Sequence, residues 1–440
     1  MIVMKFGGTS VGSAERIKIV HDIVKSRLDR DPIVVVSAVG GITDKLINTA
    51  NLAFQGGDYS AILNEIKEKH YTIIKELGLG NSLVQDKLDE FEQLIGRIAK
   101  YREVTTETMD LVQSFGERMS ARIVAAYMTK HGMEAEAHDA YDVGLVTNDN
   151  FGGAEPLPES EEQMRMHLSD KKAIPIITGF IGKTSGGAIT TLGRGGSDYS
   201  AAIVGAALNV EEIQIWTDVN GIMTTDPKIV KEAKTIDKVS FNEAAELAYF
   251  GAKVLHPKTI LPAMRKNIPV RVLNTYEPSN EGTLIVNEPS RSEKIAKAIA
   301  VKRNITVITI NSTRMIDAYG FLAKIFDIFR KYHVVVDMVS TSEVSVSVTV
   351  DKKDNLDKAI VELNRFATVN IEENKSIVCV VGEGLHHIPN VVGPLFSVLG
   401  RNNINIEMIS QGASEINIGF VVKAEDAENA VRALHKEFFG

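Results

Sequence analysis

Short apolar runs alternate with longer amphipathic stretches over the first two thirds of the chain. The apolar runs are rich in valine and isoleucine and are nearly continuous, which is typical of strands that are buried on both faces. Helical stretches separate them, so the pattern predicts an α/β fold with a mostly parallel sheet sandwiched by helices. The runs are "IVMKFGG" (2–8), "DPIVVVSAVGG" (31–41), "AIPIITGF" (173–180), "EIQIWTDV" (212–219) and "IPVRVLN" (268–274).

Glycine-rich and polar segments follow several of these runs, among them "KFGGTS", "SAVGG", "TGFIG" and "WTDVNG". Because ligands of open α/β sheets bind at the carboxyl ends of parallel strands, we expect a ligand site there. The stretch from Asn51 to Tyr127 is helical and rich in charge. It predicts a helical insertion or a long crossover on one side of the sheet.

The last third of the chain contains an internal repeat. Leu322–Met338 aligns without a gap with Val392–Met408, 70 residues further on. Each copy reads as helix, strand, hairpin strand and helix, as in ferredoxin-like βαββαβ domains, although coincidental amphipathic patterning is the alternative. A duplicated small module next to an α/β domain suggests regulation.

These patterns divide the chain into three expected domains. Residues 1–290 form the α/β domain, 291–375 the first small domain and 376–440 the second. The second small domain is too short for the full βαββαβ arrangement, and the strand near 296–304 could complete it.

Composition narrows the class of protein further. The hydrophobic content of 44% and the net charge of −8 give no general attraction to nucleic acid or to an anionic membrane. The single cysteine, Cys379, lies in an apolar run and is expected to be buried, and no disulfide can form within the chain. The N-terminus reaches glycines too early for an export signal and no apolar run is long enough to span a membrane, so we expect a cytoplasmic protein.

One segment combines several features of an anion site. "GRGGSDYSAA" (Gly193–Ala202) places glycines, a cation and a carboxylate at the start of an alanine-rich helix, where free N–H groups favour a phosphate or carboxylate. A plain connecting turn is the alternative, with Asp198 as the helix N-cap. "GFIGKT" (179–184) resembles the end of a P-loop, but Ile177 stands where that motif needs glycine, so we expect no P-loop.

Four motifs in chain order, followed by the two repeats, resemble the aspartokinases of the amino acid kinase family. The motifs are "KFGGTS", "GRGGSDYSAA", "WTDVNGIMTTDP" and "GAKVLHP". The repeats resemble ACT domains, and the resemblance covers essentially the whole chain. It implies an amino acid kinase fold with two ACT domains. It also implies that ATP, with Mg²⁺, phosphorylates the side chain of L-aspartate to 4-phospho-L-aspartate, the first step toward lysine, threonine and methionine.

The resemblance also implies roles for individual residues. Lys5 is expected at the β/γ-phosphates, and Asp198 is expected to orient Lys5 and to organise the phosphate–Mg²⁺ cluster. Arg194 is expected to bind the α-carboxylate and Glu117 the ammonium of the amino acid. Ser37 and Thr43 fall at the amino-acid pocket. An aspartate side chain is already ionised near neutral pH, since its pKa is about 3.9, so the reaction needs no general base.

For the nucleotide, the resemblance implies contacts from Lys5, Gly7, Gly8, Thr217, Asp218, Met223, Lys228 and Lys253. Met223 departs from the family, in which tyrosine is common at this position, so an aromatic contact is not expected. His256 precedes a proline and is expected to be a turn or core histidine. No His/Cys cluster suggests a protein-bound metal, and Mg²⁺ would be carried mainly by ATP.

The first repeat resembles the effector-binding repeat of lysine-sensitive aspartokinases. The matching positions are Met315, Asp317, Ala318, Val336, Asp337, Thr341, Ser342 and Glu343. Asp317 and Ala318 replace a histidine–serine pair of some relatives. The three acidic residues favour L-lysine over threonine, because they could receive a second ammonium. We also expect a homodimer or a dimer of dimers through residues after about 290. As an alternative to effector binding, these acids are solvated and the repeats only assemble the oligomer.

Two other functions stay open. The acceptor could be glutamate, N-acetylglutamate, carbamate or UMP, although Glu117 with Arg194 favours a free α-amino acid. The chain could instead be an inactive amino-acid-sensing protein, but such a protein is expected to lose Lys5, Arg194 or Asp198, and all three are present. Because the chain ends at Gly440, we expect no fused homoserine dehydrogenase.

Overall fold

The computed structural model describes residues 1–251, 255–288, 296–312, 315, 319–382, 385, 392–411 and 416–440. Contacts divide the chain into two compact units. The first comprises Met1–Ile222, Asp237–Phe241 and Val254–Pro289, and the second comprises Met223–Ile236, Asn242–Lys253 and Ser290–Gly440.

An eight-stranded sheet forms the centre of the first unit, with the order β3-β5-β2-β1-β8-β10-β11-β9. The strands from β3 to β10 are parallel, and only β11 runs antiparallel to its neighbour β10. The mostly parallel sheet expected from the sequence is therefore confirmed. The strands are β1 (Ile2–Phe6), β2 (Pro32–Val36), β3 (Ala135–His138), β5 (Ile174–Thr178), β8 (Glu212–Thr217), β9 (Lys238–Ser240), β10 (Val270–Asn274) and β11 (Thr283–Val286).

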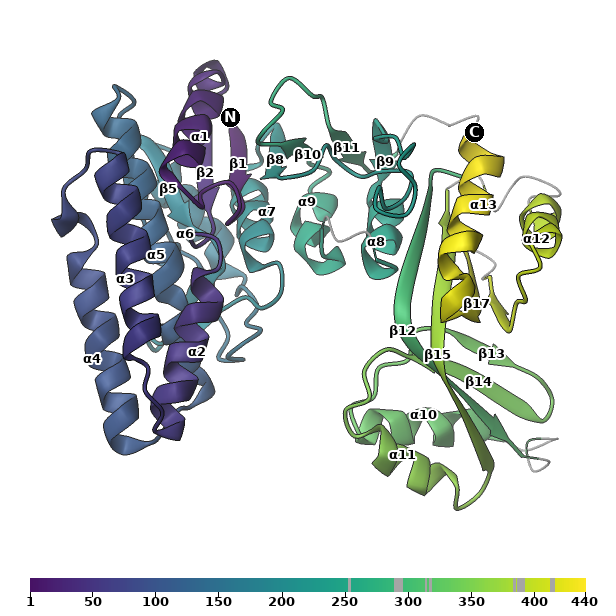
Figure 1. The fold of residues 1–440 in the computed structure, drawn as a ribbon. Helices are drawn as coiled ribbons and strands as arrows, with labels where there is room; N and C mark the ends of the chain where they lie inside the picture. The colour runs from purple at the N-terminus through teal and green to yellow at the C-terminus, as the bar shows by residue number, and fades with distance from the viewer. Residues whose placement is uncertain are drawn as a thin grey trace. The chain divides into compact units, whose positions relative to one another are not determined.

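Helices and a small second sheet complete the first unit. The helices are α1 (Ala14–Lys25), α2 (Ile42–Gln55), α3 (Ser60–Glu76), α4 (Gln85–Tyr101), α5 (Thr106–Lys130), α6 (Glu159–Leu168), α7 (Gly196–Leu208) and α9 (Leu261–Arg265). The second sheet consists of β4 (Val146–Thr147), β6 (Ile181–Thr184) and β7 (Ile189–Thr191). Figure 1 shows α2 to α5 side by side as the helical insertion that the charge-rich stretch predicts. The "GFIGKT" segment leads into strand β6 and not into a helix, so it is no P-loop.

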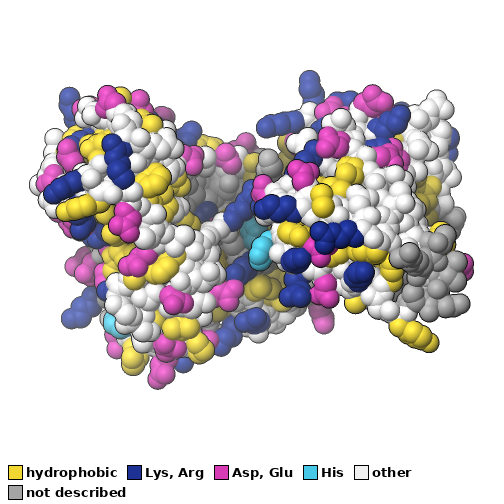
Figure 2. Space-filling view, turned by 90° about the horizontal axis from the view of Figure 1, so that it is seen from below, with side chains coloured by type: hydrophobic (Ala, Val, Ile, Leu, Met, Phe, Trp, Pro, Cys, Tyr) yellow, Lys and Arg dark blue, Asp and Glu magenta, His cyan; other side chains and the backbone are white. Residues whose placement is uncertain are grey.

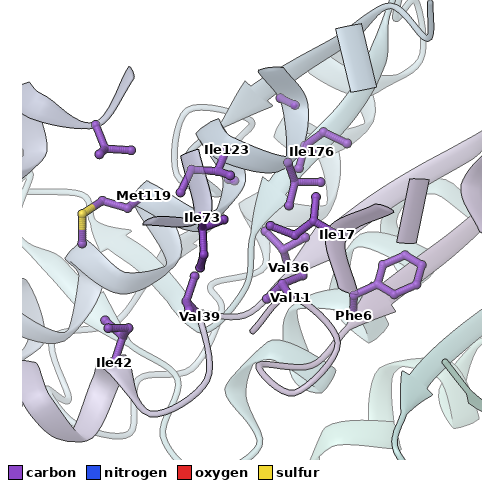
Figure 3. Packing of buried hydrophobic residues seen from close by; sticks show 14 of the residues in the cluster. Phe6, Val11, Ile17, Val36, Val39, Ile42, Ile73, Met119, Ile123 and Ile176 are labelled. Carbon is purple, nitrogen blue, oxygen red and sulfur yellow. The ribbon is translucent and has the colours of Figure 1, made fainter. Parts of the chain in front are cut away.

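The pleat of β1 divides its side chains between two faces of the sheet. Met4 and Phe6 belong to the large apolar cluster that α1 and α5 cover. Figure 3 shows Phe6 in this cluster with Ile17 of α1 and Ile123 of α5. Since neighbouring residues of a strand point to opposite faces, Lys5 points away from this cluster, toward the face that α7 covers.

A six-stranded sheet forms the second unit, with the order β13-β14-β12-β15-β17-β16. Its two central strands, β12 (Ala298–Asn311) and β15 (Thr368–Val381), run the length of both repeats. The remaining elements are α8 (Phe241–Tyr249), α10 (Phe321–Lys331), β13 (Val339–Thr341), β14 (Ser345–Val350), α11 (Leu356–Leu363), α12 (Val392–Arg401), β16 (Met408–Ser410), β17 (Asn417–Lys423) and α13 (Ala427–Phe439).

The two long strands join two ferredoxin-like lobes. The first half of β12 pairs with the second half of β15, to which β17 is added, and the second half of β12 pairs with β14. The segment near 296–304, which the sequence suggested for the last repeat, thus lies beside β15 in that lobe. The duplication extends to the backbone, because Asn304 (φ 60°) and Asn374 (φ 58°), 70 residues apart, both take the left-handed conformation where the pairing register shifts.

Two segments before residue 290 pack with the second unit. Ile229 belongs to the apolar cluster of the last lobe. From α8, the Glu243 carboxylate accepts a hydrogen bond from Lys297 Nζ at 2.8 Å, and Glu246 accepts one from Asn417 Nδ2 at 2.6 Å. These two segments thus group with the second unit by their contacts, although they precede residue 290, and the expected domain boundary at 290 stays a prediction.

The surface carries charges of both signs. Figure 2 shows lysine and arginine side chains interspersed with acidic ones on the face drawn, with no large area of a single sign. Within the ranges that the structure describes, no helix is both long and apolar enough to cross a membrane. A cytoplasmic location stays a prediction. Cys379 is buried in β15, as its apolar surroundings predicted.

Candidate active site at the strand ends of the first unit

A cavity of about 620 Å³ lies where β1 and β2 end and α7 begins. Its walls also include residues of α5 and of the segment that precedes α7. Seven residues expected at the site from the sequence line this one cavity: Lys5, Gly8, Ser37, Thr43, Glu117, Arg194 and Asp198. Parallel strands place their carboxyl ends at one edge, which brings segments distant in sequence to the same place.

An ion pair joins two residues of the cavity lining. Lys5 Nζ lies 2.6 Å from Asp198 Oδ1, and the two side chains are only 11% and 12% exposed. Lys5 is the fourth residue of β1, and Asp198 lies in the first turn of α7. The pair therefore places an ammonium and a carboxylate, both with little exposure to solvent, at the wall of the cavity.

Helix α7 presents its N-terminus to the cavity. Its N-cap is Gly195, which has a φ of 70° and supplies no side-chain cap. The interpretation of Asp198 as an N-cap is therefore wrong, because Asp198 lies inside the first turn, where its side chain pairs with Lys5. Gly196 N donates to Gly193 O, and the amides that follow it in the first turn of α7 have no side-chain cap in the structure, so they can donate to an anion, as the "GRGGSD" segment predicts.

Glu117 of α5 is a buried carboxyl group at the floor of the cavity. Its Oε1 accepts a hydrogen bond from Ala38 N at 3.1 Å, while Oε2 has no hydrogen-bond partner among the residues that the structure describes. Burial raises the pKa of Glu117 to about 8. Glu117 is therefore not a solvated residue of the helix surface. The free oxygen suits a ligand cation.

The turn after β2 brings Ser37 and Thr43 to the cavity. Ser37 N donates to Phe6 O at 3.1 Å, which continues the β1–β2 pairing by one residue. A Cβ on Gly8 would lie 2.9 Å from Ala38 O, so only glycine lets the turns after β1 and β2 approach this closely. The close approach places backbone N–H groups of both turns at the same wall.

Arg194 lies at the exposed rim of the cavity. Across the described ranges no carboxylate forms an ion pair with its guanidinium. Burial, and then the positive charge of Arg194, lower the pKa of His256. His256 itself caps the short helix that follows it, where its Nδ1 accepts from Lys258 N, so the turn interpretation of this histidine is confirmed.

The residues expected at the nucleotide are spread over both units. Gly7 N donates to Trp216 O at 3.3 Å, which places Gly7 beside the end of β8, where Thr217 Oγ1 donates to Asp218 Oδ1 at 3.2 Å. Neither Thr217 nor Asp218 lines the 620 Å³ cavity. Met223 and Lys228 belong to the second unit, and Lys253 lies outside the described residues.

The expected effector residues occupy one lobe of the second unit. Met315 and Val336 pack against its apolar core, and Thr341, Ser342 and Glu343 are exposed at the turn from β13 to β14. Asp317 and Ala318 lie outside the described residues.

Asp337, another expected effector residue, has two inequivalent oxygens. Its Oδ1 pairs with Lys302 Nζ at 2.8 Å and accepts a hydrogen bond from Tyr249 OH. Its Oδ2 is buried and has no hydrogen-bond partner within the described ranges. Asp337 is therefore half satisfied by the lobe's own groups.

Several lining residues were missed by the sequence interpretation, among them Asp44, Gln113, Gly152, Phe180 and Thr191. Gln113 and Glu117 are four residues apart, so they share a face of α5. Asp110, seven residues before Glu117, lies on the same face and is buried. This helical spacing is a signal that could have identified the polar face of α5.

Comparison with known proteins identifies the family. Residues 1–274 match the amino acid kinase family, and residues 308–365 and 378–438 match an ACT domain. The chain is 43% identical to aspartokinase 1, chloroplastic, of Arabidopsis thaliana over 455 residues, which cover 99% of this chain and 80% of that protein. The chain belongs to the aspartokinases of the amino acid kinase family. The resemblance and the fold class expected from the motifs are thereby confirmed.

Two solved structures of E. coli aspartokinase III match this chain over its whole length, and each match covers 100% of this chain and 100% of the E. coli chain. The complex with aspartate and ADP, described as the R-state, superposes with a TM-score of 0.85 at 36% sequence identity. The complex with lysine and aspartate, described as the T-state, gives a TM-score of 0.81 at 37% identity.

Within the described residues no group of three or more potential ligand side chains could hold a metal ion.

Proposed function

We propose that this aspartokinase transfers the γ-phosphoryl group of ATP to the side-chain carboxylate of L-aspartate. One observation carries the choice of a free α-amino acid as acceptor: the buried Oε2 of Glu117, which has no hydrogen-bond partner among the described residues, belongs to the same cavity lining as Arg194. A free amino acid has an ammonium for the first and an α-carboxylate for the second. N-acetylglutamate, carbamate and UMP have no ammonium, so they would leave Glu117 without a partner.

The two groups orient the acceptor. The planar guanidinium of Arg194 can donate two parallel hydrogen bonds to the α-carboxylate. Glu117 takes the ammonium, and the arrival of that charge favours the ionised form of a carboxyl whose pKa is about 8 in the free pocket. Ser37 and Thr43 border the same space. The side-chain carboxylate is left to face the end of β1 and the start of α7.

Phosphoryl transfer then requires charge neutralisation rather than a base. The aspartate carboxylate is the nucleophile, and the transferred group passes in line to one of its oxygens. Lys5 supplies a fixed positive charge for the β/γ-phosphates, and Asp198 holds the Lys5 ammonium in place at 2.6 Å. The free amides at the start of α7 and after β1 add donors for phosphate oxygens. Gly7, Gly8, Thr217, Asp218, Met223, Lys228 and Lys253 are proposed to contact the nucleotide.

Mg²⁺ fits this chemistry as a companion of the nucleotide. The cavity offers single carboxylates, such as Asp198, rather than a cage of ligands, and Mg²⁺ commonly binds through one or two carboxylates together with phosphate oxygens. Asp198 is the residue proposed to border it. When bound, the ion neutralises charge on the phosphate oxygens.

A trapping assay tests the reaction and its acceptor together. The enzyme is given ATP and Mg²⁺ with aspartate, glutamate or N-acetylglutamate in hydroxylamine, which converts an acyl phosphate to a hydroxamate. Hydroxamate from aspartate alone is expected. Formation from N-acetylglutamate, or ADP release with no hydroxamate from any acceptor, would overturn the proposal.

We further propose that L-lysine inhibits the enzyme by binding at the first lobe, which consists of the second half of β12 with β13, β14, α10 and α11. The residues proposed to contact it are Met315, Asp317, Ala318, Val336, Asp337, Thr341, Ser342 and Glu343. The buried Oδ2 of Asp337 supports this site, since it has no hydrogen-bond partner among the described residues and can accept from an ammonium without loss of the Lys302 pair. The T-state description of the lysine complex of the E. coli enzyme also supports it. Lysine would inhibit by binding the inactive arrangement more tightly.

The remaining proposals concern domains and assembly. We propose that residues 1–290 form the catalytic domain and that residues 291–375 and 376–440 form the two ACT domains. The first half of β12 would complete the second ACT domain. Assembly into a homodimer or a dimer of dimers would use these ACT domains. Both edge strands of their sheet, β13 and β16, are three residues long, and Val339 and Ile409 on them are exposed and apolar.

A further inference from the structure

Asp110 is a buried carboxylate below the candidate active site. It lies in the second turn of α5 and is 1% exposed. Its Oδ2 accepts hydrogen bonds from Gly152 N at 2.9 Å and from Thr191 N at 2.8 Å, and its Oδ1 accepts one from Thr191 Oγ1 at 2.8 Å. No cation pairs with it in the part of the chain that the structure describes. The three donors hold both oxygens of the buried carboxyl group in fixed positions.

These hydrogen bonds fix two segments that form the cavity wall. Gly152 and Thr191 both line the cavity, although they come from different parts of the chain. Thr191 O also accepts from Ala154 N at 2.9 Å, so every polar group of Thr191 is engaged. A Cβ on Gly193 would lie 3.1 Å from Gly152 O, which shows how closely the two segments pack. Through these hydrogen bonds, Asp110 joins both segments to α5.

The fixed segment leads directly into Arg194. Gly193 (φ 76°) and Gly195 (φ 70°) flank this arginine, and Gly196 N donates to Gly193 O at 3.0 Å to close the turn. The guanidinium of Arg194 forms no ion pair in the described ranges. The backbone sets the position of the Arg194 Cα and the direction of its Cα–Cβ bond, and Asp110 holds the segments next to that backbone through Gly152 N and Thr191 N.

We infer that Asp110 is a positioning residue, which acts through Thr191 and Gly152 to hold Arg194 for the α-carboxylate of the acceptor. The inference rests on the proposed function of Arg194. It predicts that loosening Asp110 weakens acceptor binding specifically. ATP binding should change little, because the Lys5–Asp198 pair stands on β1 and α7 and not on the segments that Asp110 joins.

Two substitutions at the same position separate hydrogen bonding from charge. Asp110→Ala removes all three acceptor contacts. In Asp110→Asn, the amide oxygen can still accept from both backbone N–H groups, and the amide nitrogen can donate to Thr191 Oγ1 once that hydroxyl reverses its role. We expect Asp110→Ala to raise KM for aspartate at least about tenfold, with KM for ATP within about twofold. Asp110→Asn should restore KM for aspartate to within about threefold of wild type.

A matched pair on β7 provides a test if Asp110→Ala does not fold. Thr191→Val removes only the hydroxyl bond to Asp110, and we expect KM for aspartate to rise about threefold. Thr190→Val removes a buried hydroxyl from the adjacent residue, which bonds Thr147 Oγ1 at 2.6 Å and does not line the cavity. That control should leave KM for aspartate unchanged. Circular dichroism and thermal melting report whether each variant is folded.

The outcomes are distinct from failure of the proposed function. If wild-type enzyme forms no hydroxamate from aspartate, the function itself fails. If wild type is active and folded Asp110→Ala keeps the wild-type KM for aspartate, the positioning role is overturned. A parallel rise in both KM values, or equal effects of Thr190→Val and Thr191→Val, would also overturn it, because either result indicates a general structural role.

Discussion

Lys5 Nζ and Asp198 Oδ1 lie 2.6 Å apart, although their residues are separated by most of the first unit in sequence. Strand β1 lies at the centre of the sheet, and α7 covers the face to which Lys5 points. The pair is therefore a consequence of the strand pleat and of helix placement. It sets a charged group of each sign at the position where phosphate oxygens are proposed to lie.

Substitution of either partner should lower kcat. Lys5→Ala removes the positive charge offered to the phosphates, and Asp198→Ala releases the ammonium from its position. We expect each to lower kcat by about 10²–10³, the range typical of a lost electrostatic group in an active site. Steady-state kinetics with saturating ATP and aspartate measures this. A folded Lys5→Ala variant with wild-type kcat would contradict the assignment.

Loss of one partner of the Lys5–Asp198 pair should lower the free energy of unfolding more than loss of both partners. Asp198→Ala leaves the Lys5 ammonium nearly buried without a counter-charge, which costs about 3–5 kcal/mol when a buried pair loses one partner. Lys5→Met with Asp198→Ala removes both charges, so the double variant should recover part of the unfolding free energy. Urea unfolding of wild type, of Lys5→Met, of Asp198→Ala and of the double variant compares the four proteins. Additive losses would show that the two residues do not interact.

Arg194→Ala should act mainly on the acceptor. It removes the proposed two hydrogen bonds to the α-carboxylate, so we expect KM for aspartate to rise roughly 10- to 100-fold. Arg194→Lys keeps the charge but not the fork of donors, and should recover only part of the affinity. Initial-rate measurements over a range of aspartate concentrations provide the values. Unchanged KM in a folded Arg194→Ala variant would remove the assignment.

Glu117 should make acceptor binding and stability depend on pH. Its pKa of about 8 means that the carboxyl is mostly neutral below pH 8 in the free enzyme, so KM for aspartate should fall as pH rises from 6.5 to 8.5. Glu117→Gln should raise KM and abolish this part of the pH dependence. Rate profiles of both proteins at each pH measure it, and parallel profiles would contradict the prediction.

The stability effect has a defined sign. The folded-state pKa of Glu117 lies above its ordinary value of 4.5, so the folded protein binds this proton more tightly than the unfolded chain. The contribution of the Glu117 proton to the free energy of unfolding is therefore fully present below about pH 4.5 and is lost as pH rises through about 8. Glu117→Gln should gain unfolding free energy relative to wild type over this window, as measured by denaturant unfolding.

Lysine inhibition should be relieved by loss of acidic groups in the first ACT lobe. Asp337→Ala or Glu343→Ala should raise the lysine concentration for half-inhibition at least about tenfold and leave kcat within about twofold. Asp351→Ala is the control, because Asp351 pairs with Lys302 at 3.1 Å but is not an expected effector residue. Inhibition by threonine alone, or none at millimolar lysine, would refute lysine as the effector.

Assembly through the ACT lobes should be visible in solution. We expect light scattering to give the mass of a dimer or a tetramer, and Val339→Glu on the edge strand β13 to weaken the association. Ile371→Glu on β15 changes another exposed apolar residue away from the edge strands, and it is the matched control. A monomer at working concentration, with and without lysine, would count against the proposal.

Local patterns in the sequence determined much of the fold. Buried β-branched runs predicted β1, β2, β5, β8 and β10, and the 70-residue repeat predicted two similar lobes. The motif at Gly193–Ala202 predicted a helix N-terminus at an anion site, and α7 begins there. These features follow from periodicity, turn residues and helix starts, which depend on neighbours within a few residues.

Tertiary structure alone decided the environment of the key groups. Glu117 stands beside an arginine in a charged helix, and only the packing of α5 under the turn after β2 shows that its carboxyl is buried and half unpaired. Asp198 has the sequence context of an N-cap, yet it pairs with a lysine on the central strand. Asp110 joins segments 42 and 81 residues away. Burial and ion pairing depend on which segments, distant in sequence, come together in the fold. Patterns among neighbouring residues do not contain that information.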